Sequence, residues 1–236
     1  AIVFAVFAAL MAWEWAGLMR VDPVGRVLFA VFVVASCYYV YDAPELFCMK
    51  LWWLSAAFWL LLAPLWLWRG WRMSSNDFGG YLTGWILIVP TWAAMVALQQ
   101  VHPWWLVGVM GIVWVADISA YFAGRAWGRH KLAPGISPGK TWEGVAGAVA
   151  GVSVYCVIAA WVAGISVADN LLWAPLILVL TAVSVAGDLF ESMIKRQAGV
   201  KDSSQLLPGH GGFLDRFDSQ TSMLPLAALI IFGIFL

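Results

Sequence analysis

Charge is what this sequence has least of. Only 11% of its 236 residues are Asp, Glu, Lys or Arg, and 63% are hydrophobic. A soluble domain is nearer a quarter charged, so water cannot be the solvent for most of this surface. The composition therefore predicts an integral membrane protein that is surrounded by a lipid bilayer. No nucleic-acid partner is expected.

Cysteine is scarce as well, and its spacing forms no motif. Cys37, Cys48 and Cys156 lie in or beside apolar runs, without the CxxC or Cys/His spacing of metal and redox sites. We interpret them as small hydrophobic residues in helices and expect no disulfide framework. A basic region before the first apolar run is also missing, so no cleavable signal peptide is expected.

Long apolar runs fill most of the chain. A helix that spans a bilayer needs about 20 mostly apolar residues. Because the alternating pattern of a β-barrel is absent, helices are the viable spanning structure. The sequence predicts an all-α, polytopic integral membrane helical bundle. About eight spans are expected, at 1–19, 26–41, 50–68, 81–100, 103–123, 143–167, 171–195 and 220–236.

Basic residues alternate along these spans. All but Lys50 of the 13 Lys and Arg fall in the first, third, fifth and seventh loops. The positive-inside rule places those loops in the cytoplasm. Two long polar loops, 124–142 and 196–219, then lie on one side and can form an active site there. We expect residues 1–100 to be supporting helices with oligomer contacts, and residues 101–236 to be the catalytic part.

The few charges gather near the C-terminus. Asp188, Glu191, Ser192 and Lys195 are spaced i, i+3, i+4 and i+7, so they share one helical face. Asp188 lies about 12 Å along the helix axis from Arg196. A bare carboxylate at that depth costs about 2.5–3.5 kcal/mol. It must face a hydrated cavity, a cation or a metal; the alternative is a buried ion pair that only locks helices together.

Asp215 and Asp218 form a second i, i+3 pair, at the start of the last span. With Asp188 they supply carboxylates from two elements beside basic residues. Mg²⁺ is usually bound in this way, through one or two carboxylates together with substrate phosphates. The alternative is that Asp215 and Asp218 cap a helix N-terminus.

Glycines surround a histidine between these acidic residues. Gly209, Gly211 and Gly212 let the backbone turn tightly around His210 and approach a ligand. His210 could bind phosphate, act as an acid or base, or cap the turn. Its place in a charged loop favours a functional role.

The other polar loop contains Ser137-Pro-Gly-Lys140-Thr141. Its end is similar to a Walker A motif, but the first glycine is replaced by Pro134 and we expect no preceding strand, so a P-loop is rejected. Lys140 and Ser137 can still contact phosphate. The alternative is that the basic residues of this loop serve membrane topology only.

Two more acids lie within apolar runs. Asp117 is near the expected cytoplasmic end of its span, with Tyr121 one turn on. They face the same cavity or form a helix-packing hydrogen bond, and the sequence leaves both open. Glu14 has no partner on its own helix and is interpreted as structural or interfacial.

These motifs resemble the phosphatidate cytidylyltransferases, also called CDP-diacylglycerol synthases. The family's signature is similar to Ser-x-x-Lys-Arg, then Lys-Asp, then Pro-x-His-Gly-Gly-x-x-Asp-Arg-x-Asp. The matching residues are Ser192, Lys195, Arg196, Lys201, Asp202, Pro208, His210, Gly211, Gly212, Asp215, Arg216 and Asp218. Upstream, the residues that look like the family include Asp117, Tyr121, Ser137, Lys140 and Thr141. The resemblance covers about residues 117–225 well.

The resemblance implies transfer of the cytidylyl group of CTP to phosphatidate. It implies Mg²⁺ on Asp188 and Asp215, with a second cation such as K⁺, and a homodimer in a bacterial inner membrane. The implied catalytic residues are Asp188, Asp215, Lys195, Arg196, His210 and Asp218. The implied substrate-binding residues are Ser137, Lys140, Thr141, Ser192, Lys201, Asp202, Gly211, Gly212, Arg216, Asp117 and Tyr121.

Three rival functions remain to be weighed. A CDP-alcohol phosphotransferase needs a DxxDG…G…DxxxD pattern, which fails here. A CTP-dependent lipid kinase shares the substrates and would be separated by its product. A transporter could use intramembrane acids as an ion relay, but no inverted repeat is visible and a carrier needs no charged loop of this length.

Overall fold

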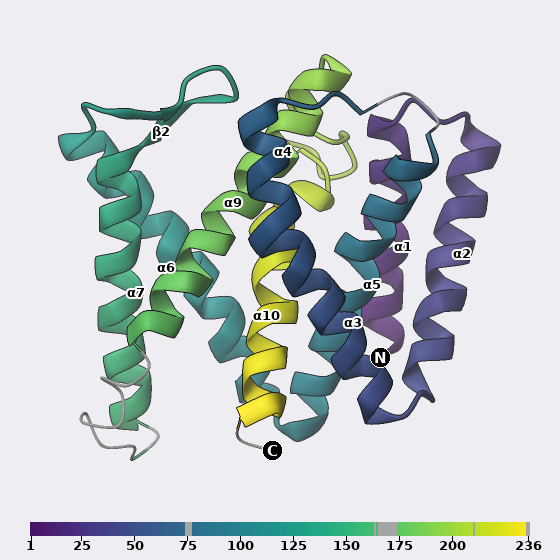
Figure 1. The fold of residues 1–236 in the computed structure, drawn as a ribbon, viewed down its shortest axis with the longest axis horizontal. Helices are drawn as coiled ribbons and strands as arrows, with labels where there is room; N and C mark the ends of the chain where they lie inside the picture. The colour runs from purple at the N-terminus through teal and green to yellow at the C-terminus, as the bar shows by residue number, and fades with distance from the viewer. Residues whose placement is uncertain (74–76, 163, 165–173, 210, 235–236) are drawn as a thin grey trace.

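The chain forms a bundle of long helices with one small β-hairpin (Figure 1). The structure, a computed structural model, describes residues 1–73, 77–162, 164, 174–209 and 211–234. The helices of the first half are α1 (Ile2–Leu18), α2 (Pro23–Tyr41), α3 (Glu45–Ala57), the π-helical turn η1 (Phe58–Leu62), α4 (Ala63–Arg69) and α5 (Phe78–Val101). The second half contains α6 (Pro103–Trp127), β1 (Lys131–Ala133), β2 (Ser137–Thr141), α7 (Trp142–Val162), α9 (Ala174–Ala198), the 3-10 turn η2 (Leu214–Arg216) and α10 (Asp218–Ile234).

Six helices are long and apolar enough to cross a membrane. They are α2, the continuous run Glu45–Arg69, α5, α6, α7 and α9 from Pro175. The prediction of a helical integral membrane protein is confirmed. The two remaining predicted spans, α1 and α10, are helices of 17 residues each, so a count of eight spans stays a prediction.

The second helix begins earlier than predicted. It starts at Pro23 rather than near residue 26, because Asp22 accepts hydrogen bonds from the amides of Val24 and Gly25. An aspartate N-cap followed by proline at the first helical position is a strong start signal. The predicted span 26–41 is therefore part of a helix of 19 residues.

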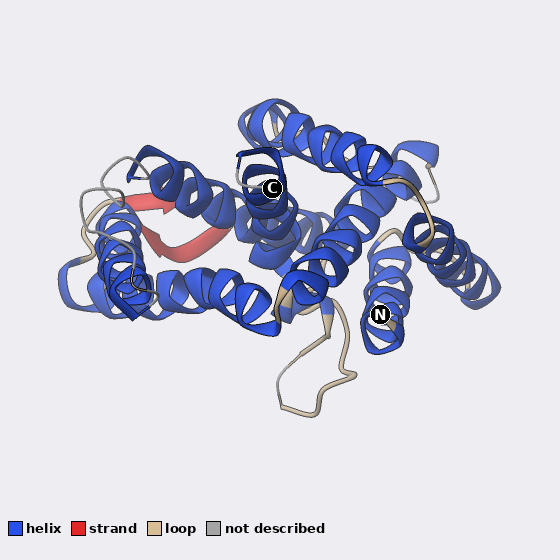
Figure 2. Ribbon diagram, turned by 90° about the horizontal axis from the view of Figure 1, so that it is seen from below, coloured by secondary structure: helices blue, strands red, loops and turns tan. Residues whose placement is uncertain are grey.

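The segment predicted as a polar loop at 124–142 contains regular structure. Helix α6 continues to Trp127, and β1 pairs antiparallel with β2, with Lys131 opposite Thr141. Figure 2 shows this hairpin on the side of the bundle that holds α6 and α7. The all-α prediction is wrong for these few residues. The expectation of no strand before Gly-Lys-Thr is also wrong, although Lys140 lies inside β2 and not in a P-loop.

The polar segments lie together at one end of the bundle. In Figure 1 the hairpin and the loop after α9 are at the top, while the start of α1 and the end of α10 are at the bottom. We call the top the hairpin end. This arrangement matches the predicted topology, in which both polar loops share a side that the chain ends do not.

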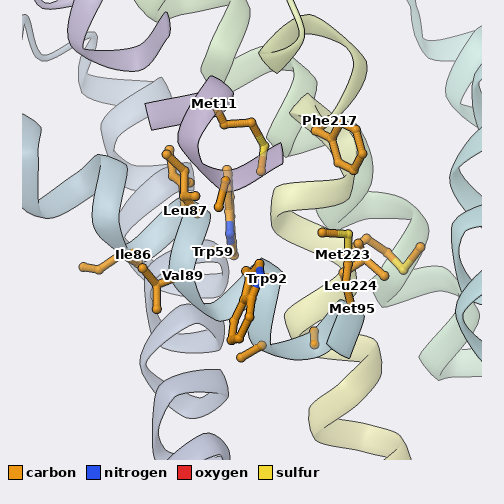
Figure 3. Packing of buried hydrophobic residues seen from close by; sticks show 14 of the residues in the cluster. Met11, Trp59, Ile86, Leu87, Val89, Trp92, Met95, Phe217, Met223 and Leu224 are labelled. Carbon is orange, nitrogen blue, oxygen red and sulfur yellow. The ribbon is translucent and has the colours of Figure 1, made fainter. Parts of the chain in front are cut away.

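Large side chains from four parts of the chain fill the core. Figure 3 shows Met11 of α1, Trp59 of η1, Trp92 of α5 and Met223 of α10 packed against one another. The indole N–H of Trp59 donates to the carbonyl of Thr221 over 3.1 Å. These contacts fix α10 against the first half of the chain.

Candidate active site

One face of α9 carries a line of polar side chains toward the hairpin end. The Ser192 hydroxyl donates to Asp188 over 3.2 Å, and the Lys195 ammonium donates to Glu191 over 3.1 Å. Both pairs are four residues apart, so the shared helical face predicted from spacing is confirmed. Glu191 and Lys195 are buried, with 5% and 8% of their surface exposed. Buried charges of this kind require paired partners.

Lys195 also connects α9 to the segment before α10. Its ammonium lies 2.6 Å from a carboxylate oxygen of Asp215 in η2. Lys195 therefore sits between two buried carboxylates, those of Glu191 and Asp215. The arrangement fixes η2 against α9 and holds one positive charge beside the other acidic residues.

The hairpin meets α9 through a second ion pair. Lys140 of β2 pairs with Asp188, and both side chains are about a quarter exposed, 24% and 27%. The Arg196 guanidinium donates to the carbonyl of Ile136 over 3.4 Å. The Arg196–Ile136 bond thus brings the two predicted polar segments into contact, and the nearby Lys140–Asp188 pair is partly open to solvent.

Asp188 lies within a group of acids that come from three helices. Asp117 of α6 and Asp218 of α10 are near enough to Asp188 to interact with it electrostatically. We call Asp117, Asp188 and Asp218 the three-carboxylate cluster. Lys140 acts on Asp117 as well as Asp188, and Lys195 acts on Asp218. Three carboxylates and two lysine ammonium groups thus interact at this end of the bundle.

The carboxylate of Asp215 is fully engaged. Besides Lys195 it accepts hydrogen bonds from the Ser203 amide at 3.0 Å, the Ser203 hydroxyl at 3.0 Å and the Gly212 amide at 2.7 Å. Burial raises the pKa of Asp215, but the bonds from Lys195 and the amides outweigh it, so the pKa lies below its usual range. Asp215 is an ionised carboxylate that organises the loop before η2.

The glycines predicted to allow a tight turn have separate roles. Gly209 and Gly211 have φ angles of 77° and 82°, in the left-handed region that favours glycine. Gly212 has an ordinary φ, but a Cβ there would collide with the Ser203 hydroxyl and lie 2.8 Å from a Glu14 oxygen. His210 lies outside the described residues.

Replacing Gly212 by Ala is expected to displace the loop and destabilise the protein by about 1–3 kcal/mol, the usual cost of overpacking. Thermal unfolding and CTP turnover of the purified variant measure both effects. Gly135→Ala is the matched control, because a Cβ at Gly135 meets nothing within 4 Å. Equal stability and activity of the two variants would contradict the assigned role of Gly212.

The other predicted substrate residues are placed as follows. The Tyr121 hydroxyl accepts a hydrogen bond from Arg125 over 3.1 Å and is exposed, so it contacts its own helix. Thr141 is buried, and its hydroxyl accepts from the Gly144 amide over 3.1 Å at the start of α7. Asp218 accepts from the Ser219 amide over 2.6 Å at the start of α10. This contact joins neighbouring residues and is not the bond to the second or third helical amide that an N-cap makes, so the capping alternative for Asp218 stays open.

The remaining predicted residues lie around this group. Ser137 pairs with Ala133 in the hairpin and is half-buried. Four predicted site residues are exposed: Arg196, Lys201, Asp202 and Arg216. The roles given to these residues stay predictions.

Sequence reasoning found no partner for Glu14, and the structure supplies four. Glu14 is 1% exposed and accepts hydrogen bonds from Ser203, Ser204, Phe213 and Leu214. Its structural interpretation is supported, and it is not an interfacial residue. The sequence contains one sign of this role, an acidic residue with no local partner inside an apolar run. It could not show the partners themselves, because they are 189–200 residues away.

The carboxylates of the site can be compared with the ligands that Mg²⁺ requires. Within the ranges that the structure describes, no three His, Cys, Asp or Glu side chains are arranged to hold a metal. Mg²⁺ needs only one or two carboxylates when substrate phosphates complete its shell. Asp188 fits, since it is partly exposed and lies within the three-carboxylate cluster. Asp215 would have to release one of its present donors to join it.

Comparison with known proteins identifies the group to which these residues belong. The model of the cytidylyltransferase family matches residues 1–234. A phosphatidate cytidylyltransferase of Pseudomonas aeruginosa is 38% identical, over 98% of this chain and 88% of that protein. One of Brucella abortus is 35% identical, over 96% of this chain and 74% of its own length. One of Haemophilus influenzae is 49% identical over 54% of this chain and 45% of its own. The resemblance predicted from the motifs is confirmed, and the chain belongs to the cytidylyltransferase family.

Proposed function

We propose that the chain transfers the cytidylyl group of CTP to phosphatidate, which forms CDP-diacylglycerol and releases pyrophosphate. The relatives that match nearly the whole chain carry the name of this activity. The observation that carries the proposal is the meeting of β2, α9 and α10 at one end of an apolar bundle. There, Lys140 and Lys195 lie among five acidic side chains, of which Asp117, Asp215 and Asp218 belong to the family's pattern.

The reaction joins two anions. An oxygen of the lipid phosphate attacks the α-phosphorus of CTP, and the bond from that phosphorus to the oxygen bridging the β-phosphate breaks. Because the attacking phosphate monoester is largely ionised near neutral pH, no strong general base is required. The catalytic work is alignment and neutralisation of charge.

The cations at the hairpin end supply that neutralisation. Lys140 pairs with Asp188, and both side chains are partly exposed, so an arriving phosphate can share the Lys140 ammonium. Arg196, Lys201 and Arg216 are exposed, and in this proposal they provide further contacts for the lipid phosphate and the leaving pyrophosphate. Lys195 is buried between Glu191 and Asp215, and its role in this proposal is to hold the Asp215 carboxylate in place.

Mg²⁺ is the cofactor that fits best. When bound, it neutralises nucleotide phosphate oxygens. Asp188 would be its first ligand, with Asp215 as the second ligand that the resemblance implies. Asp117 and Asp218 add negative charge nearby. A second cation such as K⁺ belongs to the same proposal.

The membrane keeps the lipid substrate beside the site. Exposed apolar side chains such as Phe122, Trp142 and Trp161 lie along α6 and α7, where acyl chains can contact them. We place the hairpin end in the cytoplasm of a bacterium, where CTP is available, and expect eight spans and a homodimer.

The position of a radioactive label tests the reaction type. With CTP labelled at the α-phosphorus, the lipid product becomes radioactive; with CTP labelled at the γ-phosphorus, the label is released as pyrophosphate. A CTP-dependent lipid kinase gives the reverse result, with γ-label in the lipid. That reverse result, or ion flux without nucleotide turnover, would contradict the proposal.

A further inference from the structure

Glu14 is the one acid on α1, and it is enclosed near the hairpin end of that helix. It lies four residues before the last residue of α1, Leu18, and only 1% of its surface is exposed. The ion pairs among the described residues do not include Glu14. Its charge is instead compensated by hydrogen-bond donors from a distant part of the chain.

Four donors converge on the two carboxylate oxygens. One oxygen accepts from the Ser204 hydroxyl at 2.5 Å and the Phe213 amide at 2.9 Å. The other accepts from the Leu214 amide at 2.6 Å and the Ser203 hydroxyl at 3.0 Å. A carboxylate has about four acceptor positions, and donors face each of its two oxygens here.

The four donors form two pairs, one from each end of the same loop. Ser203 and Ser204 follow α9, whereas Phe213 and Leu214 lead into η2. Because backbone amides can only donate, the site for Phe213 and Leu214 must contain an acceptor. Glu14 therefore ties the two ends of the loop together and fixes both to α1.

Glu14 is linked to Asp215 through a single side chain, that of Ser203. The Ser203 hydroxyl lies 3.0 Å from an oxygen of Glu14 and 3.0 Å from an oxygen of Asp215. Its single hydrogen is shared between the two carboxylates. Asp215 in turn binds Lys195. A connected path thus leads from α1 through the loop to α9.

We propose that Glu14 is a positioning residue, which holds Asp215 in the orientation required for cytidylyl transfer. Asp215 directly follows Leu214, whose amide Glu14 binds, so a shift of the loop end moves the Asp215 carboxylate with it. Gly212 supports the same function, since its missing side chain leaves the space that Glu14 and Ser203 occupy. The inference rests on the proposed function and on the role given there to Asp215.

Glu14→Gln tests the proposal, because glutamine has the same shape as glutamate but replaces one acceptor oxygen by an NH2 group. That group faces two of the four donors and cannot accept their hydrogen bonds. Hydrogen–deuterium exchange of the purified full chain in detergent should show at least tenfold faster exchange at Phe213 and Leu214. CDP-diacylglycerol formation per folded molecule should fall at least tenfold. The Mg²⁺ concentration for half-maximal rate should rise several-fold.

Trp15→Phe is the matched control on the neighbouring residue of α1. It removes a buried hydrogen bond of 2.9 Å to the carbonyl of Gly80, which belongs to α5 and not to the loop. It should lower thermal stability without changing loop exchange or the Mg²⁺ midpoint. If Glu14→Gln does not fold, Ser204→Ala removes one of the four bonds and is expected to change exchange and rate in the same direction.

Each outcome decides the question. Unchanged exchange at Phe213 and Leu214 would overturn the anchoring role. Faster exchange with a rate and a Mg²⁺ midpoint like those of Trp15→Phe would overturn the positioning role. If the wild-type protein forms no CDP-diacylglycerol, the proposed function fails, while the exchange measurement still tests the anchor on its own.

Discussion

Replacing Asp188 by Asn is expected to lower CDP-diacylglycerol formation at least a hundredfold. Asp188 is the acid that Lys140 reaches from the hairpin, and it is partly exposed within the three-carboxylate cluster. Asparagine keeps the shape and one oxygen but loses the charge that holds Lys140 and attracts a cation. A loss of this size corresponds to about 2.7 kcal/mol of transition-state stabilisation.

The rate, the Mg²⁺ dependence and the thermal stability of Asp188→Asn should be measured together. Because Asp188 is about a quarter exposed and paired near solvent, the fold should tolerate the change. Asp42→Asn is the control, since Asp42 is an exposed carboxylate that follows α2. Full activity with unchanged Mg²⁺ dependence in Asp188→Asn would refute the proposed metal site.

The second large effect is expected at Lys195. Lys195→Met removes the buried cation between Glu191 and Asp215 and leaves two carboxylates without it. Removing one partner of a buried ion pair costs about 3–5 kcal/mol. We expect a marked loss of thermal stability in detergent, together with loss of turnover, because Asp215 also loses its bond of 2.6 Å.

A double variant separates stability from catalysis. Lys195→Met combined with Glu191→Gln removes one of the unpaired charges, so it should recover part of the lost stability. Its turnover should stay low, because Asp215 remains without Lys195. Recovery of full turnover in the double variant would show that Lys195 serves only to balance charge in the fold.

Helical spacing predicted the part of the site that lies on a single element. The bonds from Ser192 to Asp188 and from Lys195 to Glu191 follow directly from residues four apart on α9. The apolar runs likewise predicted the membrane helices, although the Asp22 cap moved the start of α2. Local periodicity and capping determine such features, so a single sequence contains them.

The contacts between elements could not be predicted in this way. The Lys140–Asp188 pair depends on the β-hairpin that contains β2. The sequence of β2, Ser-Pro-Gly-Lys-Thr, includes Pro and Gly, which are rare in strands, so no strand was expected there. Glu14 likewise stood without a partner, because its donors come from a loop at the far end of the chain. Tertiary packing creates these pairs, and no spacing rule reaches across such separations.

The most direct test of the central claim uses the purified wild-type protein in detergent. CTP labelled at the α-phosphorus is supplied with phosphatidate, and Mg²⁺ is either present or removed by a chelator. The account predicts lipid-soluble radioactive CDP-diacylglycerol only when CTP, phosphatidate and Mg²⁺ are all present. Absence of nucleotide turnover under all of these conditions, from folded protein, would contradict it.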